Sequence, residues 1–248
     1  MSTSVPSSGG PHRSDPAPDA TSYRRRQLLF VAVLLVLLGG VDLLLMDQES
    51  WTVAVAVLAA VLLAMLARAA GLDAADLGLS RERLADGLRV GGVLSALVLA
   101  GMVVATQIPA LASAFHDERT PDELVPMLVK VGLVIPLRTV LLEELAFRGV
   151  LWGWLAKTRG EPAAVVGSSL AFGLWHVPPA LVVLKTNDAL STTTALGSAL
   201  VIGGIVAGTA TAGLLFAELR RRTGSLAAPA LLHWTVNSAG TVASYLLR

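Results

Sequence analysis

Long apolar segments separated by short polar stretches recur along the whole chain. About 20 apolar residues in a helix are enough to cross the hydrocarbon core of a bilayer. Segments of that kind lie at 27–46, 51–70, 88–108, 122–147, 162–184, 194–217 and 226–247. The pattern therefore predicts an all-α fold, a polytopic transmembrane helical bundle of about seven spans.

The composition supports an integral membrane protein. Apolar residues make up 54% of the chain and charged residues 15%, whereas a soluble domain has about 45–50% and about 25%. The net charge of +1 gives no reason to expect a nucleic-acid partner. The chain has no cysteine, which excludes disulfides and thiolate chemistry. We expect membrane lipid around a multi-pass protein of the bacterial plasma membrane.

Lysine and arginine are distributed unevenly between the two ends of the predicted helices. Thirteen of them fall on one side and three on the other, which places the N-terminus inside by the positive-inside rule. The basic run Arg24–Arg26 before the first apolar segment is also typical of an export signal. The segment is about 19 residues long and no Ala-x-Ala site follows it, which favours a first membrane helix.

The chain divides into three parts on these grounds. Residues 1–22 are rich in Ser, Pro and Gly and are expected to form a disordered cytoplasmic tail. Residues 23–118 would hold the N-terminal transmembrane helices and an amphipathic linker that Ser80 can cap. Residues 119–248 contain the polar motifs described next.

The first polar motif lies in the fourth predicted helix and consists of Glu143, Glu144 and Arg148. Glu144 and Arg148 are four residues apart and can pair on one helix face, whereas Glu143 points about 100° away. Ionisable groups inside membrane helices are costly and by default mark a functional site. Two carboxylates this close in a low dielectric should not both ionise freely, and such a group suits a general base acting on water. The alternative is a structural ion pair between helices.

The other two motifs lie in the fifth and seventh predicted helices. His176 follows Phe172 by four residues and precedes Pro178, which should kink or break the helix. His233 and Asn237 are also four apart and share a face. Histidine can move protons or bind metal, and the asparagine amide can donate to an oxyanion. Taken singly, each motif could equally be a buried hydrogen-bonded pair.

Two features concern helix shape. Pro136 lies within the fourth predicted helix and should kink it just before the Glu pair. Gly204 and Gly208 have the small-xxx-small spacing that predicts close helix packing.

The three motifs together resemble the CPBP family, the CAAX-protease and bacteriocin-processing (Abi) family of intramembrane proteases. The resemblance covers roughly residues 120–240. The matching residues are Glu143, Glu144 and Arg148, then Phe172 and His176, then His233 and Asn237. It implies that residues 119–248 form a catalytic CPBP-type helical core that hydrolyses peptide bonds.

The resemblance also implies roles. Glu143 would activate a water that attacks the peptide carbonyl, and His176 would share in binding that water or moving its proton. His233 and Asn237 would stabilise the oxyanion.

In the same scheme Glu144 and Arg148 would hold the geometry. Metal dependence stays open: a metal-free glutamate mechanism is favoured, and the alternative is zinc or another divalent ion held by Glu143, His176 and His233.

The substrate would be a peptide or protein, either a prenylated CAAX-type C-terminus or another membrane-associated peptide. Two non-proteolytic alternatives remain, an Abi-type immunity or scaffold protein and a carrier that uses membrane Glu and His as relays. The helix placement predicts an active site that opens to the cytoplasm, with His176 deepest. Arg138 has no role in the pattern.

Overall fold

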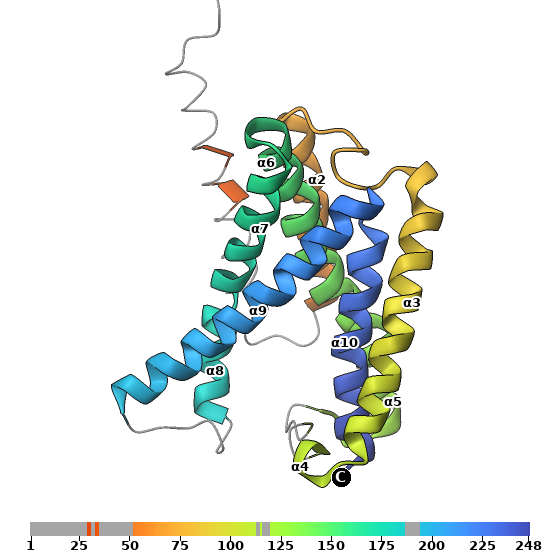
Figure 1. The fold of residues 1–248 in the computed structure, drawn as a ribbon, viewed down its shortest axis with the longest axis vertical. Coiled ribbons are helices and arrows are strands. Elements are labelled where there is room, and N and C mark those ends of the chain that lie inside the picture. Colours follow the sequence, from red (N-terminus) through yellow and green to blue (C-terminus); the bar gives the residue numbers. More distant parts are fainter. Residues whose placement is uncertain (1–28, 31–32, 35–51, 113–114, 116–119, 187–193) are drawn as a thin grey trace, which may run out of the picture.

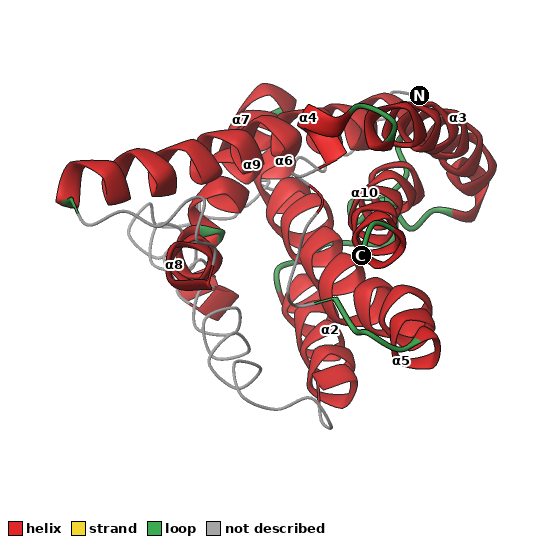
Figure 2. Ribbon diagram, turned by 90° about the horizontal axis from the view of Figure 1, so that it is seen from below, coloured by secondary structure: helices red, strands yellow, loops and turns green. Residues whose placement is uncertain are grey.

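The computed structural model describes residues 29–30, 33–34, 52–112, 115, 120–186 and 194–248. Within these residues every regular element is a helix (Figure 2). In chain order they are α2 (Thr52–Ala69), α3 (Arg81–Thr106), α4 (Pro109–Ala112), α5 (Leu124–Val129), η2 (Lys130–Leu141), η3 (Glu144–Leu151), α6 (Trp152–Arg159), α7 (Glu161–Trp175), α8 (Val177–Thr186), α9 (Ala195–Thr223) and α10 (Ala227–Leu246). The predicted tail 1–22 and most of the predicted span 27–46 lie outside the described residues.

Five helices of the described part are long and apolar enough to cross a membrane. They are Thr52–Ala69, Arg81–Thr106, Leu124–Arg159, Glu161–Leu184 and Ala195–Thr223. The all-helical fold is therefore confirmed, with five candidate membrane spans in the described residues, whereas the count of seven is not. The last predicted segment, 226–247, is the helix α10, but its histidine, asparagine and hydroxyl residues make it less apolar than the five. Several of them, including His233 and Ser238, are buried against neighbouring helices.

The helices pack in two groups that meet at the junction of α9 and α10. α10 packs along α3, and α9 packs along α7 and α8 and leans away from α10 toward its own N-terminal end (Figure 1). The turn between α9 and α10 depends on Gly224, which adopts a left-handed conformation with φ of 65°. This conformation ends the helix, as glycine does at many helix C-termini, and turns the chain so that α10 begins at Ala227.

Small residues bring α7 and α9 together. A Cβ added to Gly173 would come within 2.8 Å of the Val206 carbonyl oxygen, and one added to Gly213 within 3.1 Å of the Ser169 Cα. The predicted packing role of Gly204 and Gly208 is wrong for the described part of the chain, where a Cβ at either position would meet no atom within 4 Å. Spacing alone could not reveal which face of α9 meets a neighbour.

The helix that carries the acidic pair is wider than an α-helix over much of its length. η2 and η3 are π-helices, joined by Leu142 and Glu143. Pro136, where the sequence predicts a kink, lies inside η2 and cannot donate to a helical carbonyl. π-Helical turns are rare and concentrate at functional sites.

The connection between α2 and α3 is anchored to the ends of α6 and α9. Arg220 is 3% exposed, and its Nη2 donates to the carbonyl oxygens of Ala75 (3.1 Å) and Asp76 (2.9 Å). Lys157 Nζ donates to Asp76 Oδ2 over 2.8 Å. Gly78 has φ of 72°, and a Cβ there would overlap the Arg220 guanidinium. The segment 81–89, predicted as an amphipathic linker, forms the first turns of α3.

Candidate active site

The first and third polar motifs meet through one carboxylate oxygen. Glu144 Oε1 accepts a hydrogen bond from Arg148 Nη1 over 3.1 Å, one turn along η3. The same oxygen lies 2.8 Å from Nδ1 of His233 on α10. Because the ionised carboxylate can only accept, Nδ1 carries the hydrogen of that bond. Glu144 therefore fixes both the position and the tautomer of His233, as carboxylates do for catalytic histidines.

The second carboxylate approaches the opposite side of the same imidazole. Glu143 Oε2 lies 3.9 Å from His233 Nε2, too far for a direct hydrogen bond. The Glu143 side chain is 13% exposed, whereas the Glu144 side chain is 1% exposed. Glu143 is thus the more exposed of the two acids, although its Oε2 is buried and makes no hydrogen bond to the described residues; Glu144 is enclosed by protein.

Arg148 completes this cluster and is itself fully buried. Its Nε and Nη2, and the second oxygen of Glu144, make no hydrogen bond within the described part of the chain. Burying a charged group is costly unless its partners are well placed. The ion pair with Glu144 and the two aromatic rings described next supply that compensation.

Two phenylalanines from different helices enclose the guanidinium. Arg148 Cζ lies 4.0 Å from the ring centroid of Phe172 on α7 and 5.0 Å from that of Phe216 on α9. Both distances are within the range of cation–π attraction. Phe216 also stacks on His233 with 5.1 Å between centroids and 24° between planes. Phe172, the first residue of the second motif, therefore lies within the cluster.

His176 ends α7, as the following prolines predicted. The helix stops at Trp175 and α8 starts at Val177. His176 Nδ1 lies 2.8 Å from the carbonyl oxygen of Phe172, so Nδ1 is the donor and Nε2 of the neutral ring is left as an acceptor. Its ring packs edge-on against Phe172 with 4.6 Å between centroids.

Asn237 lies one turn after His233 on α10 and is half-buried. Its side chain makes no hydrogen bond to the residues that the structure describes, so its amide is available to a ligand. Arg138, which had no role in the sequence pattern, is half-buried within η2.

The side chains as placed do not form a ready metal site. Among the described residues, no three histidine, aspartate or glutamate side chains converge at metal-binding distance. His233 Nδ1 is engaged by Glu144 and His176 Nδ1 by a carbonyl. We therefore derive no step through a metal.

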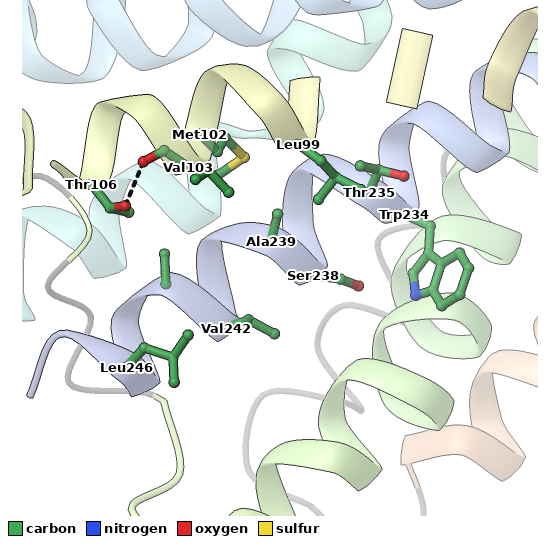
Figure 3. Close-up of a pocket in the computed structure, with 11 residues that line it drawn as sticks. Leu99, Met102, Val103, Thr106, Trp234, Thr235, Ser238, Ala239, Val242 and Leu246 are labelled. Carbon is green, nitrogen blue, oxygen red and sulfur yellow. Dashed lines mark hydrogen bonds between the residues drawn. The ribbon is translucent and has the colours of Figure 1, made fainter. Parts of the chain in front are cut away.

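A separate cavity of about 350 Å³ lies between α3 and α10 (Figure 3). Its wall on α10 includes Thr235, Ala239 and Val242. These residues lie on the face of α10 away from His233 and Asn237, by the 100° turn per residue of an α-helix. The cavity is therefore separated from the acidic cluster by the helix itself.

An all-helical membrane protein with a buried Glu–His–Arg cluster has the architecture expected of an intramembrane hydrolase. Residues 123–239 match the family model described as type II CAAX prenyl endopeptidase Rce1-like. This part of the chain is similar to the CPBP family of CAAX proteases, and the match supports a membrane protease of that type. No curated protein and no solved structure matched the chain.

One residue of the cluster has no counterpart in the sequence motifs. Phe216 is a single aromatic residue in a long apolar helix, where a buried core residue is the ordinary interpretation. Gly213, one turn earlier, is the only local signal, because it permits the close approach of α7.

Proposed function

We propose that this protein is a CAAX-type endopeptidase in which Glu143 activates a water molecule for attack on a peptide bond. The observation that carries the proposal is the hydrogen bond from His233 to Glu144, which turns His233 Nε2 toward Glu143. Two acceptors then face each other across 3.9 Å, and a shared donor between them would relieve their repulsion.

A water molecule fits that requirement. It would donate one hydrogen to Glu143 and the other to Nε2 of the neutral His233, which leaves its oxygen lone pairs free. Glu143 takes a proton as the water oxygen bonds to the peptide carbonyl carbon. When the carbon–nitrogen bond breaks, the same proton passes to the leaving amine, so Glu143 serves as base and then as acid.

The negative charge that forms on the former carbonyl oxygen must be stabilised by hydrogen-bond donors. Asn237 is free to supply its amide N–H groups from the face of α10 that carries His233, and removing one such donor typically costs about 10²–10³ in kcat. The resemblance also assigns His233 to this task, which Nε2 can perform only in the protonated ring. His176 Nε2 remains an acceptor beside Glu143 that can relay a proton.

Glu144 and Arg148 act on the geometry in this scheme and do not touch the substrate. Glu144 orients His233, and Arg148 neutralises Glu144 in a site of low dielectric. We propose that no bound metal is needed, because one acid, its oriented imidazole and an amide donor supply the base and the oxyanion donor.

The substrate class follows from the family and stays a proposal. A prenylated C-terminal CAAX peptide would reach the site from the membrane, where the isoprenoid chain dissolves. We further propose that the site opens to the cytoplasm, the side on which such peptides are made.

The test uses the full chain reconstituted in liposomes with a farnesylated CAAX peptide, and cleavage products identified by mass spectrometry. Wild type should release the tripeptide, and Glu143→Gln should lower kcat by about 10²–10⁴, the usual contribution of a general base. The control is Glu218→Gln, since the Glu218 side chain is partly exposed and pairs with Arg221 and Arg222.

Three results would revise the proposal. Cleavage that survives Glu143→Gln would reject this residue as the base. Cleavage that a chelator abolishes and zinc restores would reject the metal-free mechanism. Cleavage of the unprenylated peptide at the same rate would reject the substrate class.

A further inference from the structure

Phe216 joins the acidic cluster from a helix that contributes none of its charged groups. It is 5% exposed. Its ring lies nearly parallel to the imidazole of His233, with 5.1 Å between centroids. It also lies within cation–π distance of Arg148, at 5.0 Å from Cζ.

The stacking limits the rotation of the His233 ring. The hydrogen bond from Nδ1 to Glu144 fixes one atom of the imidazole, but the ring can still tilt about that bond. A parallel aromatic surface on one side, and the edge contact with Phe172 at 6.0 Å on another, define the plane. Nε2 is thereby held toward Glu143.

The same ring completes the enclosure of Arg148. The guanidinium lies against the rings of Phe172 and Phe216, whose centroids are 6.5 Å apart, and presents Nη1 to Glu144. Cation–π attraction to the two rings stabilises the buried cation in addition to its ion pair with Glu144.

The backbone is arranged to bring this ring to the site. A Cβ at Gly213, one turn before Phe216, would come within 3.3 Å of the Phe172 ring. Since α7 and α9 meet at glycine there, the rings of Phe172 and Phe216 reach the same guanidinium from two helices.

We propose that Phe216 is a positioning residue of the site, which holds His233 and Arg148 in the arrangement needed for water activation. It acts through those two residues and does not contact the substrate. The kinetic part of this inference rests on the proposed function.

The test compares Phe216→Leu, Phe216→Tyr and Leu219→Ala in the liposome assay. Leu219 lies in the same buried apolar cluster of α9 but has no ring to stack on an imidazole. Phe216→Leu should lower kcat by about tenfold or more, because small misplacements of catalytic groups are costly, and should leave KM within about twofold. Phe216→Tyr should retain most of the activity, and Leu219→Ala should lower Tm without that loss of kcat.

A second measurement does not depend on activity. We expect the Tm losses of Phe216→Leu and His233→Gln to be less than additive in the double variant, as for residues in contact. The losses of Leu219→Ala and His233→Gln should add. If the wild-type protein does not cleave the peptide, the proposed function is contradicted. If the Tm losses add for both pairs of variants, or if Phe216→Leu leaves kcat unchanged, the role of Phe216 is overturned.

Discussion

At the scale of single residues, the buried charges of the cluster are stabilised by one another. Glu144 and Arg148 are both 0% exposed, and removing one partner of such a pair leaves an uncompensated charge at a cost of about 3–5 kcal/mol. Hydrophobic residues of similar size could fill the same space at lower cost. The pair is therefore best explained by what it does to His233.

Arg148→Lys tests whether the shape of the cation matters as well as its charge. Lysine keeps the charge but loses the planar group that packs against Phe172 and Phe216. We expect the protein to fold and insert, with kcat lower by about 10–100-fold, because Glu144 and His233 lose their fixed geometry. The control is Arg221→Lys, on the exposed end of α9, where Arg221 pairs with Glu218. Full activity in Arg148→Lys would show that only the charge of Arg148 matters, and not the shape of its guanidinium.

The residues of the cluster differ in how far the sequence could predict them. Charged and imidazole groups stand out in an apolar chain, so Glu143, Glu144, Arg148 and His233 could be singled out from the sequence, and the family resemblance predicted that they converge. A phenylalanine in an apolar helix gives no such signal, and Phe216 could be assigned only from its contacts.

At the scale of helices, the site depends on how closely α7 and α9 approach each other. Gly173→Ala should force the new Cβ against the carbonyl oxygen of Val206 and the Cβ of Ala210. Because backbone cannot move aside cheaply, we expect a loss of about 1–3 kcal/mol in the free energy of unfolding and reduced cleavage.

Gly208→Ala is the matched control on α9, since a Cβ there meets open space in the described part of the chain. It should be neutral or stabilising by up to about 1 kcal/mol through helix propensity. Equal Tm losses in the two variants would contradict the packing argument. Thermal unfolding in detergent would measure the Tm of Gly173→Ala and of Gly208→Ala.

The connection between α2 and α3 gives a prediction about pH. Burial opposes ionisation of Asp76, but hydrogen bonds from Lys157 and from the Asp73 backbone outweigh it and hold the pKa of Asp76 below its usual range. A carboxylate whose pKa is lower in the folded protein stabilises it above the unfolded-state pKa, and this stabilisation is lost as the pH falls through the folded-state value.

Asp76→Asn should therefore lower Tm slightly at pH 7, since the ion pair is partly exposed and worth little. The difference from wild type should shrink as the pH falls through the folded-state pKa of Asp76, below which both side chains are neutral. Asp86→Asn, at an exposed position of α3, serves as the control. A Tm difference that persists at low pH would assign the effect of Asp76 to its shape and not to its charge.

At the scale of the whole molecule, hydrophobic pattern predicted helices better than it predicted spans. Apolar runs located α2, α3, α7 and α9, because lipid-facing helices must be apolar along their length. α10 has the length of a span, but its polar residues are buried by packing against other helices. The π-helical turns of η2 and η3 had no signal in the sequence beyond Pro136.

The orientation of the bundle is the remaining global prediction, and the absence of native cysteine makes it easy to test. Ala74→Cys lies in the connection between α2 and α3, and Ala195→Cys lies at the start of α9; both positions are exposed. Three candidate spans separate the two positions, so they should lie on opposite sides of the membrane. An impermeant maleimide should label Ala195→Cys in intact cells and Ala74→Cys only after the membrane is opened.

The same reagent tests where the site opens. A Cβ at Gly149, in the turn after Arg148, would lie 3.7 Å from the carbonyl oxygen of Leu77, so the cluster lies toward the end of the bundle that carries the Ala74 connection. If that end is cytoplasmic, Glu143→Cys should react from the same side as Ala74→Cys, more slowly because Glu143 is only 13% exposed. Labelling of Glu143→Cys from the outside alone would reverse the direction in which substrate enters, while leaving the chemistry of the acidic pair unchanged.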